Sequence, residues 1–235
     1  MIVRRRPGAA GGPPFIAIAQ HDHGQVSGQF AERWTWGGTP GPEATFAIGN
    51  HDICWVGLDA TVRWGPGEPA PYSFMDYPLA PKYVAYTAGI DLVETSSPYS
   101  GWLVSRHFAR FASMLDDPLS AEFVAQERAR EERLEDAFTP EQRRTGEFDF
   151  DLLVLCDALS LFMCLNEPGE NTWPWYRDGL RFRGERLTPT WDGPHRLHLA
   201  PNPLAAPIEV VLPGELLDAD GVPIDREVAS IVVGG

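Results

Sequence analysis

The chain has 235 residues, of which 43% are hydrophobic and 22% are charged, as is usual for a soluble globular protein. Lysine and arginine total 19 against 33 aspartate and glutamate residues, and the resulting net charge of −14 argues against nucleic acid and anionic membranes as partners. The sequence has no apolar run of about 18 residues, the length that a membrane-spanning helix needs. We therefore expect a single domain over residues 1–235.

The cysteines and the N-terminal segment both indicate a cytoplasmic protein. Cys54, Cys156 and Cys164 are odd in number, form no C-x-x-C pair and lie in apolar stretches, which is typical of buried thiols in a reducing compartment. The start, MIVRRRPGAAGGPPFIAIAQ, has the arginines of a signal peptide, but prolines and glycines break the apolar core that a signal peptide requires. A short strand, a Gly/Pro turn and a second strand fit these residues better.

After this hairpin the pattern predicts helices as far as residue 165. Clusters of Gly and Pro separate them, and Ser97-Pro98 and Thr139-Pro140 are helix starts, the second with a capping-box glutamine. The expected helices cover residues 21–36, 42–58, 81–94, 98–115, 120–138 and 148–165, and an ordered loop covers 61–81. Residues 170–235 carry short β-branched runs such as IEVVL and VASIVV, which predict strands. We therefore expect a mainly α fold, with a helical core at 20–165 and a strand-rich appendage made of 1–19 and 170–235.

Asp157 is the strongest single indication of a functional site. It is the only charged residue in the run LLVLCDALSLFMCL, and apolar residues surround it on every face of the expected helix. Burying a lone carboxylate is costly unless a cation, hydrogen-bond donors or a raised pKa compensates for the lost hydration. A salt bridge to one of the arginines explains the residue as well as a ligand role does, so both interpretations stay open.

A second polar element, the pair His51-Asp52, lies in the middle of the apolar run TFAIGNHDICWVGL, which we expect to be helical. Adjacent residues of a helix differ by about 100° in direction, so both side chains can lean toward one point in a groove between helices. An imidazole beside a carboxylate is a common pair of ligands for Fe, Mn or Zn. Because such a dipeptide often occurs by chance, the pair alone is a weak indication.

Two further histidines are candidates for the same site. His23 lies at the start of the first expected helix, in HGQVSGQFAERW, whose small residues allow close packing against a neighbour. His107 shares a helix face with Leu103, Val104 and Phe111, at spacings of three and four residues, and should point inward. The alternatives are a surface position for His23 and a hydrogen-bonded core position for His107.

In chain order these residues resemble the HD-domain superfamily of metal-dependent phosphohydrolases. The pattern of that superfamily is a His at the start of one helix, a His-Asp pair on the next and a distant Asp on a late apolar helix. HGQVSGQFA and VLCDALSLF resemble its first and last helices, over about residues 20–165. A second resemblance covers nearly the whole chain: the start MIV and the runs AQHDHGQVSGQFAERW, YSFMDYPL, SPYSGWLVSRHF and LCDALSLFMCLNEPGE are similar to an uncharacterised bacterial family, the domain-of-unknown-function family 3891. That second family implies no reaction.

The HD resemblance implies both a fold and a site. The fold would be an HD-like helical bundle with a small β-sheet built from the N-terminal hairpin and the C-terminal tail. In the site, His23, His51, Asp52 and Asp157 would hold a divalent transition metal (Fe, Mn, Zn or Co). Asp52 would be able to bridge a second ion and His107 matches the extra histidine of binuclear members, so these two are the catalytic candidates. The chain departs from the pattern because binuclear members usually have two such histidines, so His21 or an oxygen ligand would have to complete a second site.

Three functions agree with this sequence. The first is a metal-dependent, HD-like hydrolase of a small phosphorylated metabolite, whose metal would activate water. Arg106 and Lys82 are the candidates for substrate phosphate contact, or else surface cations. The second is an HD-fold non-haem di-iron oxygenase of a small organic substrate, which the aromatic loops would suit, and the third is a non-catalytic metal-binding or scaffolding protein. The expected partners are a small-molecule substrate and, in a homodimer, a second copy of the chain, but neither nucleic acid nor membrane.

Overall fold

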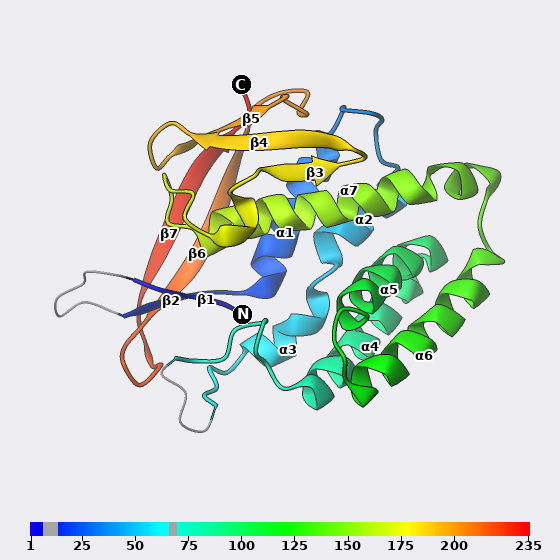
Figure 1. The fold of residues 1–235 in the computed structure, drawn as a ribbon, viewed down its shortest axis with the longest axis horizontal. Helices are drawn as coiled ribbons and strands as arrows, with labels where there is room; N and C mark the ends of the chain where they lie inside the picture. The colour runs from blue at the N-terminus through cyan, green and yellow to red at the C-terminus, as the bar shows by residue number, and fades with distance from the viewer. Residues whose placement is uncertain (7–13, 66–69) are drawn as a thin grey trace.

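A curled sheet forms one side of the molecule, and the helices pack against it in the computed structural model, which describes residues 1–6, 14–65 and 70–235 (Figure 1). Helices account for 49% of the structure and strands for 21%. The strands of the described residues are β1 (Ile2–Arg5), β2 (Phe15–Ile18), β3 (Leu180–Phe182), β4 (Glu185–Trp191), β5 (Arg196–Ala200), β6 (Ile208–Leu217) and β7 (Pro223–Val233). They form one seven-stranded sheet in the order β1-β2-β6-β7-β5-β4-β3. All neighbours are antiparallel except β5 and β7, which are parallel.

The helices α1 and α7 lie between this sheet and the remaining helices (Figure 1). The helices are α1 (Gln20–Glu32), α2 (Pro42–Asn50), α3 (Val56–Asp59), α4 (Leu79–Ser96), α5 (Pro98–Ala112), α6 (Pro118–Glu135) and α7 (Pro140–Leu165), with 3₁₀ turns η1 (Ile53–Trp55) and η2 (Pro174–Tyr176). No helix in the described part of the chain is both long and apolar enough to cross a membrane. The Gly/Pro turn expected after β1 falls on residues 7–13, outside the described residues, as do residues 66–69 of the expected loop.

The expectation of a mainly α, HD-like bundle with a small sheet is wrong, because the sheet has seven strands, contributed by both ends of the chain, and forms one side of the core. Alternate residues of β6 are buried, and Val210 and Leu212 belong to the same apolar cluster as Leu153 of α7. The dipeptide Pro213-Gly214 indicates a turn in the sequence, yet β6 runs straight through it as one ten-residue strand. Residues 170–235 therefore supply most of the sheet against which the helices pack.

Two local contacts explain how β6 tolerates these residues. The pairing of β2 with β6 stops at Ala17 and Glu215, so Pro213 has a partner strand on one side only, where a missing N–H is acceptable. A Cβ atom on Gly214 would lie 2.5 Å from the side chain of Ile16 on β2, so the glycine leaves room for that side chain. Long-range packing therefore decides the conformation of a segment whose local sequence indicates a break.

The helix that carries Asp157 is longer than the expected 148–165. It starts at Pro140, where Thr139 and Gln142 form the predicted capping box, and continues for 26 residues to Leu165.

A close backbone contact joins α1 to α2: a Cβ on Gly28 would lie 2.8 Å from the Cα of Gly49. The absence of both side chains lets the two backbones touch, which brings the start of α1 beside the end of α2.

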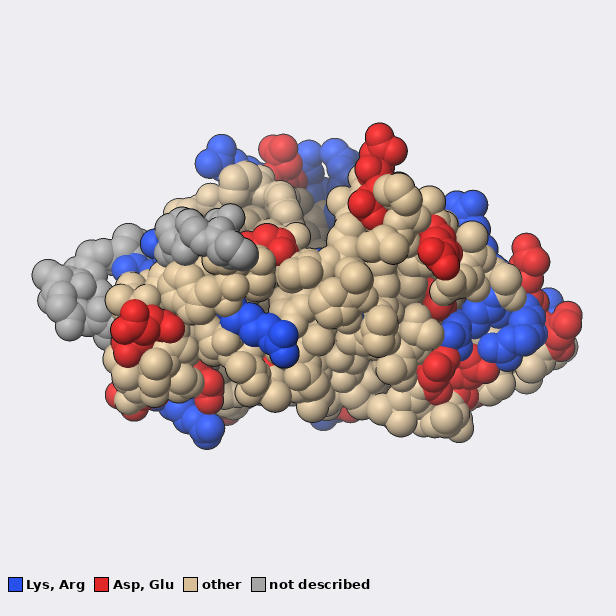
Figure 2. All heavy atoms as spheres, turned by 90° about the horizontal axis from the view of Figure 1, so that it is seen from below, with Lys and Arg blue, Asp and Glu red and all other residues tan. Residues whose placement is uncertain are grey.

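Charged side chains are unevenly distributed over the surface. On the face shown in Figure 2, acidic and basic groups are interspersed at the end of the molecule where α6 lies, while most of the remaining face is uncharged. The sequence of α6, PLSAEFVAQERAREERLE, supplies both signs in close succession. The amphipathic, densely charged pattern of this segment therefore corresponds to a helix with one face in water.

Candidate metal centre

His51 and Asp52 occupy a break between two helical segments, and not the middle of one helix as expected. α2 ends at Asn50, His51 follows as its C-cap, and Asp52 has φ −101° and ψ 20°, in the bridge region between helix and strand conformations. The Nδ1 atom of His51 lies 2.7 Å from the carbonyl oxygen of Ile48 and donates to it. This turn, and not the 100° spacing of a helix, directs both side chains toward α1 and α7.

Five side chains from four segments converge at this point. His23 Nε2 lies 2.8 Å from Asp52 Oδ2 and 3.8 Å from Asp157 Oδ1. His51 Nε2 lies 3.7 Å from Asp52 Oδ2 and 3.6 Å from Asp157 Oδ1. His107 Nε2 on α5 lies 3.9 Å from Asp157 Oδ2. All five residues are at most 5% exposed, so three imidazoles and two carboxylates share one buried space.

Hydrogen bonds outside this space fix two of the rings. His23 Nδ1 lies 2.6 Å from Ser160 Oγ on α7, and His51 Nδ1 is bonded to the Ile48 carbonyl. Both rings therefore present Nε2 to the centre, and His51 Nε2 has no hydrogen-bond partner among the described residues. Metal-binding histidines characteristically have their second ring nitrogen bonded in this way, which sets the tautomer and the orientation. The residues therefore fit a metal ion, because a buried nitrogen without a partner is directed at two carboxylates.

The ligand atoms fall into two overlapping groups, each of which could hold a metal ion. His23, His51 and Asp52 form one, and His51, His107 and Asp157 form the other, with all ligand atoms of a group within 4.8 Å of one another. His51 belongs to both groups, but its single free nitrogen can bind only one ion, whereas a carboxylate can bridge two. The donor set therefore suits one divalent ion, or two that share a carboxylate.

Electrostatic interactions within the cluster are strong because it is shielded from water. Burial alone would lower the pKa of His51, but Asp52 and Asp157 raise it to about 9. Burial would likewise raise the pKa of the carboxyl groups, but the histidines hold the pKa of Asp52 below its usual range and that of Asp157 at about 2. The pKa of His107 is lowered by burial to about 3, although Asp157 opposes this. Without a metal, a protonated His51 thus faces two carboxylates, and a cation of higher charge can replace that proton.

The two candidates for phosphate contact lie in different surroundings. Lys82 on α4 is buried, and its Nζ donates to the Phe74 carbonyl oxygen at 2.7 Å and lies over the ring of Trp55. Arg106 precedes His107 on α5 and forms two hydrogen bonds to Glu147, at 2.7 and 2.9 Å. The charge of Lys82 is therefore engaged inside the protein, while Arg106 is held at the surface. Substrate binding by either residue stays a prediction.

Sequence reasoning missed the residues that support the ligands. Ser160 is three residues after Asp157, on the adjoining face of α7, and also lies 2.9 Å from Ser27 Oγ of α1. The sequence signal for Ser160 is its position, one helical turn from a buried carboxylate on an otherwise apolar part of the helix. The role of the Ile48 carbonyl could not be predicted from the sequence, because the carbonyl oxygen reaches His51 only where the helix ends after Asn50. His21 is half-buried and belongs to neither ligand group among the described residues.

Comparison with known proteins identifies the family. The model of a family described as Protein of unknown function (DUF3891) matches residues 1–219. The chain belongs to this family. The DUF3891 match confirms the resemblance seen in the sequence motifs, and it does not confirm the resemblance to the HD-domain superfamily. No curated protein and no solved structure matches this DUF3891 chain.

Proposed function

We propose that this protein is a metal-dependent hydrolase of a small phosphorylated metabolite. The observation that carries the proposal is the orientation of His23 and His51, whose Nδ1 atoms are bonded outward and whose Nε2 atoms face Asp52 and Asp157. Three imidazoles and two carboxylates are a donor set that suits Mn, Fe, Co or Zn. A divalent ion bound there would supply Lewis acidity and lower the pKa of water.

Other residues of the site would orient the ligands, admit water and substrate, and transfer a proton. Ser160 and the Ile48 carbonyl would hold the rings in place, so that the ligand atoms need little rearrangement when a metal binds. The two aspartates have the largest exposed fractions in the cluster, 4% for Asp52 and 5% for Asp157, so water and substrate would approach on their side. His107, whose Nε2 lies 3.9 Å from Asp157 Oδ2, would exchange a proton through that nitrogen.

The test measures metal content and phosphate release in the same samples. Elemental analysis of protein purified without chelator should find a transition metal bound to the chain. Release of inorganic phosphate from a panel of small phosphate monoesters should stop after chelation and return after reloading with metal. His51→Ala should lose both metal and activity, because it removes a ligand atom common to both groups. The matched control is His198→Ala, since the side chain of His198 on β5 is 40% exposed and belongs to neither ligand group of the described residues.

The outcomes distinguish the alternatives. Absence of transition metal from the wild-type protein would refute the proposal. Bound iron with oxygen consumption, and without phosphate release, would show an oxygenase instead. Bound metal with neither activity over the panel, and with a lowered melting temperature after chelation, would show that the metal supports the fold.

A further inference from the structure

A groove lined by three arginines lies on two of the helices that carry ligands of the candidate metal centre. It has a volume of about 300 Å³ and is formed by α5, α6 and the first half of α7. We call it the arginine groove; its lining residues are Arg106, Ala109, Arg110, Ser113, Arg128, Glu131 and Phe150. In a chain with a net charge of −14, three cations around one small groove form a local site for an anion.

Two of these arginines are not used by the protein itself. Within the described ranges of the chain, neither Arg110 nor Arg128 has an ion pair, and Arg110 lies over the ring of Phe111 at 5.3 Å. Arg106 is held flat against Phe150, at 4.2 Å from the ring centroid, and bonds to Glu147 with its two terminal nitrogens. The groove therefore offers two guanidinium groups without an ion pair, next to a third that is fixed in position, and Glu131 of the same lining interacts electrostatically with Arg106 and Arg128.

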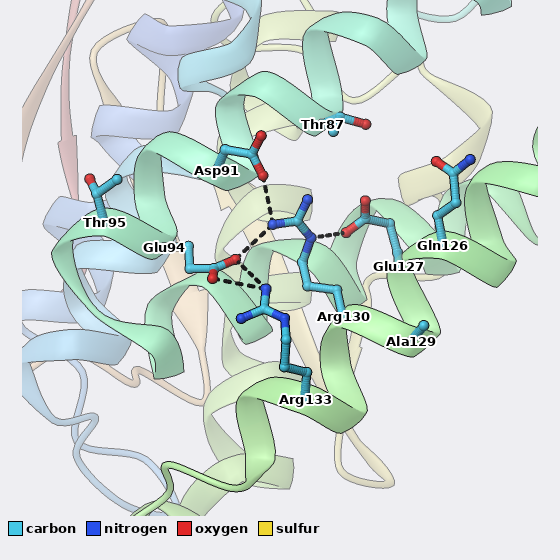
Figure 3. Close-up of a pocket in the computed structure, with 9 residues that line it drawn as sticks. All are labelled: Thr87, Asp91, Glu94, Thr95, Gln126, Glu127, Ala129, Arg130 and Arg133. Atoms are coloured by element: carbon cyan, nitrogen blue, oxygen red, sulfur yellow. Dashed lines mark hydrogen bonds and ion pairs between the residues drawn. The ribbon is translucent and has the colours of Figure 1, made fainter.

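The neighbouring groove between α4 and α6 shows what a purely structural arrangement looks like in this protein (Figure 3). It is larger, about 720 Å³, but its arginines face carboxylates of the same groove. Arg130 lies 2.7 Å from Asp91, 2.7 Å from Glu94 and 2.9 Å from Glu127, and Arg133 lies 2.9 Å from Glu94. These pairs join α4 to α6 and leave little positive charge for a ligand, in contrast to the arginine groove.

Glu131 adds a second requirement to the ligand of the arginine groove. Its Oε1 atom is buried and has no hydrogen-bond partner in the described part of the protein. A buried carboxylate oxygen without a donor is unfavourable, so a ligand that supplies a hydroxyl group would satisfy it. The lining therefore matches a molecule that carries an anionic group for the arginines and a hydroxyl group for Glu131.

The position of the arginine groove connects it to the metal centre. Arg106 and Arg110 flank His107 on α5, and the charge of Arg110 contributes to the low pKa of that histidine. On α7, Phe150 of the groove precedes Asp157 by seven residues, which is about two helical turns and about 10 Å along the helix. The arginine groove and the metal centre therefore share α5 and α7 but lie about two helical turns apart along α7.

From this geometry we infer that the arginine groove binds a hydroxylated phosphate ester at a site of its own, separate from the metal centre. The inference does not depend on the proposed function. Binding of the ester by the arginines and Glu131 does not require the metal.

The test therefore uses protein stripped of metal. Isothermal titration calorimetry with glycerol 3-phosphate should show saturable binding that weakens with added salt. Arg128→Gln should weaken this binding about tenfold or more, because a charge-assisted hydrogen bond is lost. Arg133→Gln is the matched control, since it removes the same charge from the same helix but from the other groove, and it should leave binding unchanged. Glu131→Leu should weaken binding of glycerol 3-phosphate relative to inorganic phosphate, which lacks the alcohol, because leucine cannot accept a hydrogen bond from the ligand hydroxyl.

Two results would overturn the inference. One is the absence of saturable binding to the metal-free protein, and the other is an equal effect of Arg128→Gln and Arg133→Gln. The inference and the proposed function also fail separately. If the metal-loaded protein hydrolyses phosphate esters but the metal-free protein shows no binding of glycerol 3-phosphate that depends on Arg128, the inference is wrong and the hydrolase proposal stands. If the groove binds the ester but the metal-loaded protein releases no phosphate, the hydrolase proposal is wrong and the binding site stands.

Discussion

Replacing Asp157 with asparagine tests the metal centre most directly, because this carboxylate is within 4 Å of all three histidines. Asparagine has the same shape, so Asp157→Asn removes a charged ligand without opening a cavity. The measured quantity is the rise in melting temperature when metal is added to the chelated protein. A difference between two scans of the same variant is independent of any change in the stability of the metal-free protein.

The size of the expected effect follows from mass action. Metal at about 100 times its dissociation constant stabilises the wild-type fold by about 2.7 kcal/mol, which for a chain of this length raises the melting temperature by about 5–11 °C. Losing a support of a metal ligand weakens binding by about 10–100-fold, and losing the ligand should reach at least the upper end of that range. At the same metal concentration, a 100-fold weaker site gives about 0.4 kcal/mol, or about 1–2 °C.

The control is Asp151→Asn, which changes the same charge on the same helix at a site that is 40% exposed and paired with Arg183 at the surface. It should keep the full metal-induced shift. If Asp157→Asn also keeps a shift of about 5 °C or more, Asp157 is not a ligand and the reasoning that places the metal between these side chains is wrong.

Three further predictions concern the surroundings of the site. Ser160→Ala should weaken metal binding by about 10–100-fold in a competition titration, because it frees the ring of His23, whereas unchanged affinity would show that the hydrogen bond has no orienting role. Gly28→Ala should lower the melting temperature, because its Cβ atom would press against the α2 backbone. Gly57→Ala, where a Cβ atom meets open space, should leave the melting temperature unchanged or slightly higher. Similar melting temperatures for the two variants would contradict the close packing of α1 on α2. Burial raises the pKa of Glu131 from 4.5 to about 7, so the folded protein keeps a proton that the unfolded chain has lost, and unfolding free energy should fall as pH rises between these values. Urea titrations across this range should show a smaller fall for Glu131→Gln, and equal slopes would refute the assignment.

Most residues of the candidate site could be predicted from the sequence, because each of them interrupts an apolar pattern. Asp157 is the only charge in its run, and His107 lies at the inward spacing of its helix; the structure places both in the buried cluster. The pair His51-Asp52 is predictable for the same reason, but its backbone conformation, a break between two helical segments, is not. The bridge conformation of Asp52 that ends the helical segment is stabilised by contacts with α1, such as the hydrogen bond to His23, which local propensity does not contain.

The sheet was less predictable because its strands are joined by distant parts of the chain. β2 has only four residues, and its place in the sheet depends on β6, about 200 residues later. Pro213 and Gly214 divide β6 into two apparent short runs, so the local pattern underestimates its length. Periodicity finds such strands one at a time, whereas the size of the sheet is decided by pairings between segments far apart in sequence.

The link between β2 and β6 also has a consequence for the order of events during biosynthesis. His23 lies five residues after the end of β2, on the helix that this strand positions, yet β6, which pairs with β2, is synthesised only after residue 207. A hairpin of two four-residue strands is at best marginally stable in water, so α1 gains its final position only when β6 arrives. The nascent chain therefore cannot present all the ligands together, and we expect a metal ion to be captured after synthesis of the C-terminal strands, from whichever metals the compartment of the folded protein supplies.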